Sequence, residues 1–590
     1  MCYLNRTYRV LLTIAEGKLE DAQSYRQDGN RIFARLAESD PNNAEWQREL
    51  SVSTDKVGDV LAARGNLAEA LKSYRGSLGI RQRLTRADPS NAGWQLDLAV
   101  SYDNVADVLV AEGNLPDALK FRLDGNAIFT RLANADPDNA GWQRELSVSD
   151  NRIGAVQVRR GNLPEALKAY RDSLAIRERL TKSDPNNAEW RADYSESLDR
   201  VGHVLVKQGN LTEALKDFLE GMEIRRLLAQ ADPNNAGWQV NLAASFDDIG
   251  DVLVAEGNLP EALKSYRGSL DIRQTLTTSD SNNAQWKDDL SDSFTKVGEV
   301  QIKLGDLPDA MKNFRDGLEI VDRLAKGDSS NEDLQLDLAA AYDNIGDVLV
   351  AESKLPEALK FRQDANTIFA RLAQSDPNNA GWQRELSVSD DKIGEVFVRQ
   401  DKLPEALKYY RDSLAIRQQL TKSDPNNAGW QSDLSESFDN LGEVLARQND
   451  LAGALKQFRD SQAAREQLSK SDPNNAGWQL DLAVSYDNIA DVMEAQGNPS
   501  DGLKNRRDAH EIFARLAKSD PDNAGWQREL AVSYSRLAEA QRKTGASASA
   551  LNALRQGQTI MQRMTQLSPD NPAWKEELGW FNDQIAHAGK

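Results

Sequence analysis

Two apolar stripes with helical spacing alternate along the whole chain. After the segment Asp-Pro-Asn-Asn-Ala-Gly-Trp at 472–478, apolar side chains recur at intervals of three to four residues, which predicts an amphipathic helix. This stripe comprises Trp478, Leu482, Tyr486, Ile489 and Val492. A second stripe follows turns such as Gly-Asn-Leu-Pro at 257–260, where Pro260 stands in the first helical turn and needs no N–H partner. We call the first helix of each such pair helix A and the second helix B.

The pair of helices repeats with a period of 48 residues. Tryptophan keeps this interval near the start of helix A, with Leu334 in the one vacant position and Trp580 off the period. The periodic residues are Trp46, Trp94, Trp142, Trp190, Trp238, Trp286, Trp382, Trp430, Trp478, Trp526 and Trp574. The turn between the helices keeps the same interval from Gly17 to Gly545, so the period predicts twelve hairpins. Since neither helix can bury its stripe alone, neighbouring hairpins must stack.

Each hairpin contains a segment that resembles the tetratricopeptide repeat, whose pattern is W-x2-L-G-x2-Y, then A-x3-F and P. The residues that carry the resemblance in one hairpin are Phe438, Leu441, Gly442, Leu445, Ala454, Phe458 and Pro473. The family's repeat has about 34 residues, whereas each of the two helices here is about seven residues longer. Seven residues are close to two helical turns, so the added segment keeps the same face toward the neighbour. Long repeats of the kinesin-light-chain type are similar.

The resemblance implies an all-α fold, a right-handed superhelical α-solenoid of twelve antiparallel helix hairpins. We expect a single solenoid over residues 1–570 and a C-terminal capping helix over residues 571–590. The first helix A begins late in the period, which fits either a truncated cap or a preceding domain. The stretch that begins at Phe121 reappears at Phe361, five repeats later, which indicates duplication of a block.

Charge and composition narrow the classes of function. The 590 residues include 92 acidic and 72 basic ones, and the net charge of -20 argues against nucleic-acid binding. One cysteine, Cys2, excludes a disulfide framework, and three histidines far apart in sequence do not read as a metal cluster. The apolar patch at 10–14 is too short for a membrane span or a signal peptide, so we expect a cytoplasmic protein without membrane contact.

No motif in the sequence predicts catalysis. The segment Asp136-Pro-Asp138-Asn139-Ala140-Gly141 imitates the start of a calcium loop, but Ser147 stands where that loop needs glutamate. The same segment recurs as a helix cap in other repeats. The sequence has no phosphate loop, nucleophile elbow or zinc-ligand spacing. We therefore expect a protein that is not an enzyme and has no cofactor or metal.

The candidate binding residues follow from the resemblance, which implies that helix A lines a concave groove. Aspartate recurs at the fifth motif position, and the ninth position is acidic in most repeats. Five hairpins have aspartate at both positions and alanine at the thirteenth. These pairs are Asp55 and Asp59, Asp103 and Asp107, Asp247 and Asp251, Asp343 and Asp347, and Asp487 and Asp491. Like charges four residues apart destabilise a helix by a few tenths of a kcal/mol, so this series of aspartate pairs requires an explanation.

Two interpretations of the acidic groove are open. Either it binds a basic segment of a partner protein, or it is a solvated polar face that keeps a long solenoid soluble. Members of the family that capture acidic C-termini present lysine in this groove. This chain has aspartate in that place, which disfavours a receptor for acidic chain ends. We therefore predict a protein-protein interaction scaffold or adaptor. The alternative is the sensor or regulatory arm of a larger signalling assembly whose effector domain lies on another chain or upstream.

Overall fold

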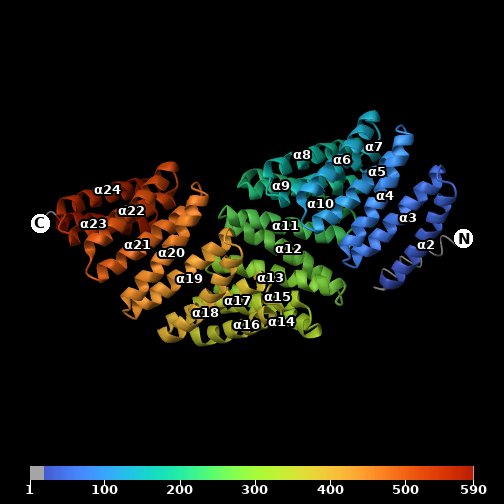
Figure 1. Ribbon diagram of the computed structural model, residues 1–590. Coiled ribbons are helices and arrows are strands. Elements are labelled where there is room, and N and C mark those ends of the chain that lie inside the picture. The colour runs from blue at the N-terminus through green and yellow to red at the C-terminus, as the bar shows by residue number, and fades with distance from the viewer. Residues whose placement is uncertain (1–18, 589–590) are drawn as a thin grey trace. The chain divides into compact units, whose positions relative to one another are not determined.

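The computed structural model describes residues 19–588, and all regular secondary structure within them is α-helical (Figure 1). Helices A are α3 (Ala44–Ala63), α5 (Ala92–Ala111), α7 (Ala140–Arg159), α9 (Ala188–Lys207), α11 (Ala236–Ala255), α13 (Ala284–Leu304), α15 (Glu332–Ala351), α17 (Ala380–Arg399), α19 (Ala428–Arg447), α21 (Ala476–Ala495) and α23 (Ala524–Lys543). Helices B are α2 (Leu19–Ser39), α4 (Leu67–Ala87), α6 (Leu115–Ala135), α8 (Leu163–Ser183), α10 (Leu211–Ala231), α12 (Leu259–Ser279), α14 (Leu307–Gly327), α16 (Leu355–Ser375), α18 (Leu403–Ser423), α20 (Leu451–Ser471), α22 (Pro499–Ser519) and α24 (Ser547–Leu567). The helix α25 (Pro572–Ala588) follows the last hairpin. The first predicted helix A lies outside the described residues.

The chain divides into two compact units, residues 1–304 and 305–590. The described helices of the first unit are α2 to α13, and those of the second are α14 to α25. Within each unit, every helix packs against the helices before and after it in sequence. The predicted all-α series of stacked antiparallel hairpins is thereby confirmed. That residues 1–570 form one solenoid capped by 571–590 stays a prediction. None of the described helices is both long and apolar enough to cross a membrane.

An asparagine side chain caps the start of helix A. In α7, Asn139 Oδ1 accepts a hydrogen bond from the Trp142 backbone N–H at 3.2 Å, and the Asn139 N–H donates to the Asp136 carbonyl oxygen at 3.2 Å. The same bond from the periodic tryptophan recurs in α3, α5, α9, α11, α17, α19, α21 and α23. The segment that imitates a calcium loop is thus a helix cap, which satisfies backbone N–H groups that have no partner inside the helix.

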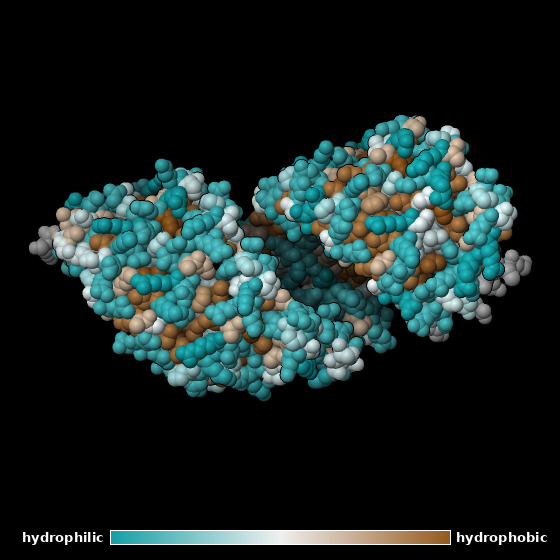
Figure 2. Space-filling view, viewed as in Figure 1, coloured by the Kyte–Doolittle hydropathy of each residue, from teal (hydrophilic) through white to brown (hydrophobic). Residues whose placement is uncertain are grey.

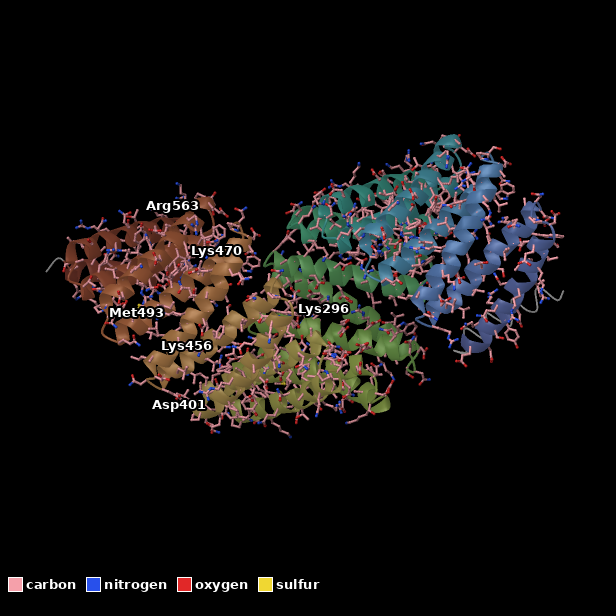
Figure 3. The ribbon with its side chains drawn as sticks, viewed as in Figure 1. Lys296, Asp401, Lys456, Lys470, Met493 and Arg563 are labelled. Atoms are coloured by element: carbon pink, nitrogen blue, oxygen red, sulfur yellow. The ribbon has the colours of Figure 1, made fainter. Side chains whose placement is uncertain are left out.

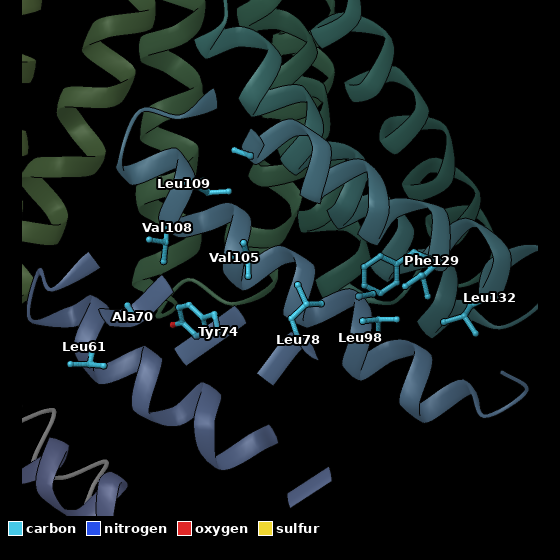
Figure 4. Close-up of a cluster of buried hydrophobic side chains, with 13 residues drawn as sticks. Leu61, Ala70, Tyr74, Leu78, Leu98, Val105, Val108, Leu109, Phe129 and Leu132 are labelled. Atoms are coloured by element: carbon cyan, nitrogen blue, oxygen red, sulfur yellow. The ribbon is translucent and has the colours of Figure 1, made fainter. Parts of the chain in front are cut away.

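A buried apolar cluster joins successive hairpins in the first unit (Figure 4). Tyr74 of α4 lies in one cluster with Leu98 of α5 and Phe129 of α6, and Trp142 of α7 packs against it, partly buried. Leu334 has the corresponding position against a cluster in the second unit. The periodic tryptophan therefore contributes to packing between hairpins. In the view of Figure 2, the surfaces of both units are mostly hydrophilic with smaller apolar areas.

The turn from helix A to helix B requires a residue in the left-handed conformation. Gly257 has a φ of 78°, and seven other turn glycines in the described residues have similar values. Three residues with side chains adopt the same conformation, namely Ser353 (φ 59°), Asp401 (φ 58°) and Asn449 (φ 63°). Aspartate and asparagine tolerate it better than serine because their short side chains hydrogen-bond locally. Ser353 is therefore the most strained of the three turns.

We expect Ser353→Gly to raise the free energy of unfolding by about 1 kcal/mol, because glycine enters the left-handed region without a steric cost. Urea denaturation followed by circular dichroism measures the change. Gly257→Ser is the matched control, and it should lower the free energy of unfolding by a similar amount. An unchanged midpoint for Ser353→Gly would show that this turn is not strained.

Candidate protein-binding groove

The two acidic rows on helices A differ in burial. The aspartates at the fifth motif position are only 2% to 8% exposed, and we call them the buried row: Asp55, Asp103, Asp247, Asp343 and Asp487. Those at the ninth position have side chains 41% to 66% exposed, and we call them the exposed row: Asp59, Asp107, Asp251, Asp347 and Asp491. The expectation that both rows face an open groove is thus wrong for the buried row, because arginines from helix B approach its carboxylates.

An arginine whose side chain is at most 16% exposed pairs with each carboxylate of the buried row. Arg81 of α4 donates to Asp55 of α3 at 2.8 Å. It also donates to the Asp97 carbonyl oxygen at 2.7 Å and to Ser101 Oγ at 2.8 Å, both on α5 of the next hairpin. The same arrangement pairs Arg225 with Asp199, Arg273 with Asp247, Arg417 with Asp391 and Arg465 with Asp439. Because a buried charge is tolerated only when it is paired and hydrogen-bonded, one guanidinium here holds three helices together.

A second arrangement places the arginine seven residues earlier on helix B. Arg122 of α6 donates to Asp103 at 2.6 Å and also to Asp107, so that it bridges both rows on α5. Phe129 then stands where the first arrangement has its arginine. The other examples are Arg362 with Asp343 and Asp347, and Arg506 with Asp487 and Asp491. Seven residues are close to two helical turns, so the guanidinium and the aromatic ring exchange places on one face of helix B.

The exposed row also has partners within the chain. The Tyr74 hydroxyl donates to Asp59 at 3.0 Å, and Lys56 donates to the same carboxylate at 2.8 Å. In the first arrangement the aromatic residue thus reaches the exposed row while the arginine reaches the buried row. In the second arrangement the arginine reaches both.

Cations from the following hairpin complete the network. Lys296 of α13 lies 3.0 Å from Asp251, and Lys392 of α17 lies 3.1 Å from Asp343. Arg152 and Arg536 pair in the same way with Asp103 and Asp487. The acidic rows are therefore part of the ion pairing that joins successive hairpins. This role explains a ladder of like charges that a single helix would disfavour.

Helix B carries a sequence signal for these arginines. Where the earlier position is arginine, phenylalanine follows seven residues later: Arg122 and Phe129, Arg362 and Phe369, and Arg506 and Phe513. Where it is aromatic, arginine follows in six helices: Tyr74 and Arg81, Tyr170 and Arg177, Phe218 and Arg225, Tyr266 and Arg273, Tyr410 and Arg417, and Phe458 and Arg465. In α14 the aromatic Phe314 is followed by Val321 instead. An examination of helix A alone misses this exchange.

Buried carboxyl groups with an amide partner lie between two pairs of neighbouring hairpins. Asn366 of α16 donates to Asp390 of α17 at 2.8 Å, and Asn126 of α6 donates to Asp150 of α7 at 2.7 Å. Burial raises the pKa of each carboxyl group to about 6, although the hydrogen bond from asparagine opposes the shift. These carboxylates are therefore less stable in the folded protein than in water.

Residues 151–186 and 195–234, within α7 to α10, match the family profile described as tetratricopeptide repeat. The predicted resemblance is thereby confirmed, and the 48-residue helix periodicity carries the same pattern into the other hairpins. No curated protein matches the sequence.

Three solved structures match the chain at low sequence identity. BtubC (BKLC) from P. vanneervenii is 18% identical, with a TM-score of 0.36, and the match covers 44% of this chain and 92% of that one. A Signal Transduction ATPase with Numerous Domains (STAND) protein with a tetratricopeptide repeat sensor, from Pyrococcus horikoshii, is 11% identical with a TM-score of 0.43, over 75% of this chain and 56% of that one. Yeast Tom70 is 13% identical with a TM-score of 0.35, over 91% and 95%.

Exchanging the arginine and the ring in one hairpin tests the two arrangements. We expect Arg362→Tyr and Phe369→Arg, each alone, to lower the free energy of unfolding by about 3 kcal/mol. The first removes the arginine that pairs with Asp343, and the second buries an additional arginine whose carboxylate partner is already taken by Arg362. The double variant restores one arginine and one ring, and Gly346 of α15 leaves room for the tyrosine as Gly58 does for Tyr74. Its stability should lie within about 1 kcal/mol of the parent in urea denaturation. Additive losses in the double variant would contradict the exchange.

The raised pKa of Asp390 predicts a pH-dependent effect of Asp390→Asn. The pKa is about 6 in the folded protein and about 3.9 when unfolded, so the folded state binds more protons between these values. Ionisation of Asp390 therefore lowers the free energy of unfolding as the pH rises from about 4 to about 6. The loss is complete above about pH 6 and absent below about pH 4. We expect Asp390→Asn to stabilise the protein by about 2 kcal/mol at pH 7.5 and by much less at pH 4.5. Urea denaturation at both pH values measures the difference, and an equal gain at both would contradict the shift.

Proposed function

We propose that this protein is a non-catalytic scaffold or adaptor that binds a basic segment of a partner protein along the surface formed by helices A. The observation that carries the proposal is the exposed row, whose carboxylates stand at one register of five hairpins with side chains 41% to 66% exposed. Within each unit, a partner segment would meet the carboxylates of that unit in succession, so that weak contacts at several repeats add up.

The charge of the chain favours a cationic protein segment over other ligands. A net charge of -20 repels the phosphates of nucleic acids and anionic membrane surfaces. Two cations that accompany the exposed row, Lys56 and Lys296, have side chains 50% and 32% exposed. Ion pairs of this exposure contribute about 0–1 kcal/mol, so a cation of the partner can exchange with them at low cost.

The acidic side chains of the rows serve as counter-ions and hydrogen-bond acceptors for arginine, tyrosine and lysine within the chain. This structural role accounts for them without catalysis, metal or cofactor, and it supports a scaffold over an enzyme. The scaffold binds neither nucleic acid nor membrane, and it acts in the cytoplasm.

The exposed row can be tested without touching the buried row. The groove variant combines Asp107→Asn, Asp251→Asn and Asp491→Asn, and the matched control combines Glu165→Gln, Glu261→Gln and Glu405→Gln in the first turns of helices B. Both remove three negative charges. In affinity capture from the native host's lysate, we expect one protein to be retained by the intact chain and by the control. The groove variant should retain about tenfold less of it.

Circular dichroism melting must first show that both variants fold like the intact chain. If the groove variant then captures the same proteins in the same amounts, the exposed row is a solvated face and the proposal is wrong.

A further inference from the structure

A hollow of about 340 Å³ opens between α19, α20 and α21 in the second unit. Its apolar lining comes from Leu451, Phe458 and Val492, and the carboxylates of Glu443 and Asp491 stand at the same hollow. Phe458 and Val492 are buried, whereas both acidic residues are exposed. The hollow thus combines an apolar floor with two carboxylates at the surface, of which Asp491 already pairs with Arg506, and Arg447 also lines it.

The corresponding place four repeats earlier contains a lysine of the chain itself. Lys296 of α13 lies 3.0 and 3.1 Å from the two carboxylate oxygens of Asp251 and 5.3 Å from the centroid of the Tyr266 ring. Figure 3 labels Lys296 on its helix. An ammonium group that is held by a carboxylate and an aromatic face gains from both, and its aliphatic stem covers apolar surface. This arrangement shows that a lysine ammonium group fits between the acid and the aromatic ring at this position of the repeat.

In the hollow, the acid and the ring are present but the lysine is missing. In the repeat, Glu443 corresponds to Asp251 and Phe458 corresponds to Tyr266. The position that corresponds to Lys296 is occupied by Asn488. Asparagine is too short and carries no charge. Among the described residues, no cation forms an ion pair with Glu443, although Arg447 follows it by one helical turn.

Smaller side chains also open the space. Ala446 corresponds to Val254 of the earlier repeat, and Ala495 corresponds to Lys303, so both side chains are smaller here. Both alanines line the hollow. In this hollow, the position that corresponds to Lys296 is thus uncharged, and the space around it is larger.

We propose that this hollow binds a lysine side chain of the partner segment, with the ammonium at Glu443 beside the Phe458 ring and the stem on Leu451 and Val492. The inference rests on the proposed function and names one subsite of it. The compact ammonium suits the site better than a guanidinium, because Arg447 lines the same hollow and a planar fork needs more room.

Asn488→Lys tests the subsite by filling it from within the chain. The probe is a fluorescein-labelled octalysine peptide, titrated into the full chain and followed by fluorescence anisotropy. We expect Asn488→Lys to raise the Kd about fivefold, because the new lysine occupies the place of the probe's side chain. The matched control is Asn104→Lys at the same register of α5, where Asp59 already pairs with Lys56. This control adds the same charge and should change the Kd by less than about twofold.

A second measurement needs no partner. Asn488→Lys should raise the melting temperature of the intact chain, and the gain should vanish when Glu443→Gln is also present. Glu395→Gln is the matched control, since Glu395 already pairs with Arg399 at 2.8 Å, and it should leave the gain in place. A gain that is unchanged by Glu443→Gln would overturn the subsite.

The outcomes separate the subsite from the wider function. If octalysine binds the chain but Asn488→Lys and Asn104→Lys weaken it equally, the groove function stands and the subsite is wrong. If octalysine does not bind the intact chain, while the melting experiment shows the coupling, the hollow accepts an ammonium and the basic partner segment is wrong.

Discussion

The buried pair of aspartate and arginine inside a hairpin is the interaction on which the rest of the structure depends. Eight helices A supply the aspartate, and helix B of the same hairpin supplies the arginine. A charge taken out of water must find its counter-ion, so neither residue can change alone without a large cost. Where helix A lacks the aspartate, as at Asn151 of α7, Arg177 pairs with Glu196 of the next hairpin instead.

This pairing determines what the acidic rows can offer to a partner. Because Arg81 and its equivalents take up the buried row, only the exposed row remains at the surface. The exposed row is in turn held by tyrosine, arginine or lysine, so its carboxylates are oriented before a partner arrives. A pre-oriented charge loses less side-chain entropy on binding, and this favours the exposed row as a contact surface.

The hollow beside Glu443 arises where this internal pairing is incomplete. In the first unit, Lys296 supplies the cation that Asp251 and Tyr266 attract. In the second unit, Asn488 supplies none at the same register. Asn488, Ala446 and Ala495 together distinguish this hollow from the place that Lys296 fills, and near-identical repeats can in this way carry a specific contact.

The sequence alone determined the helices, their caps, the turns and the 48-residue period, because these depend on residues close in the chain and on regular spacing. It also located both acidic rows. Only the tertiary structure decided which row is buried. Asp103 and Asp107 are one turn apart on α5, and their exposure differs because of how the neighbouring helix packs on them. The partners lie 15 to 26 residues away on helix B or about one repeat away on the next helix A. Contacts at such separations follow from packing, and no local pattern on helix A reveals them.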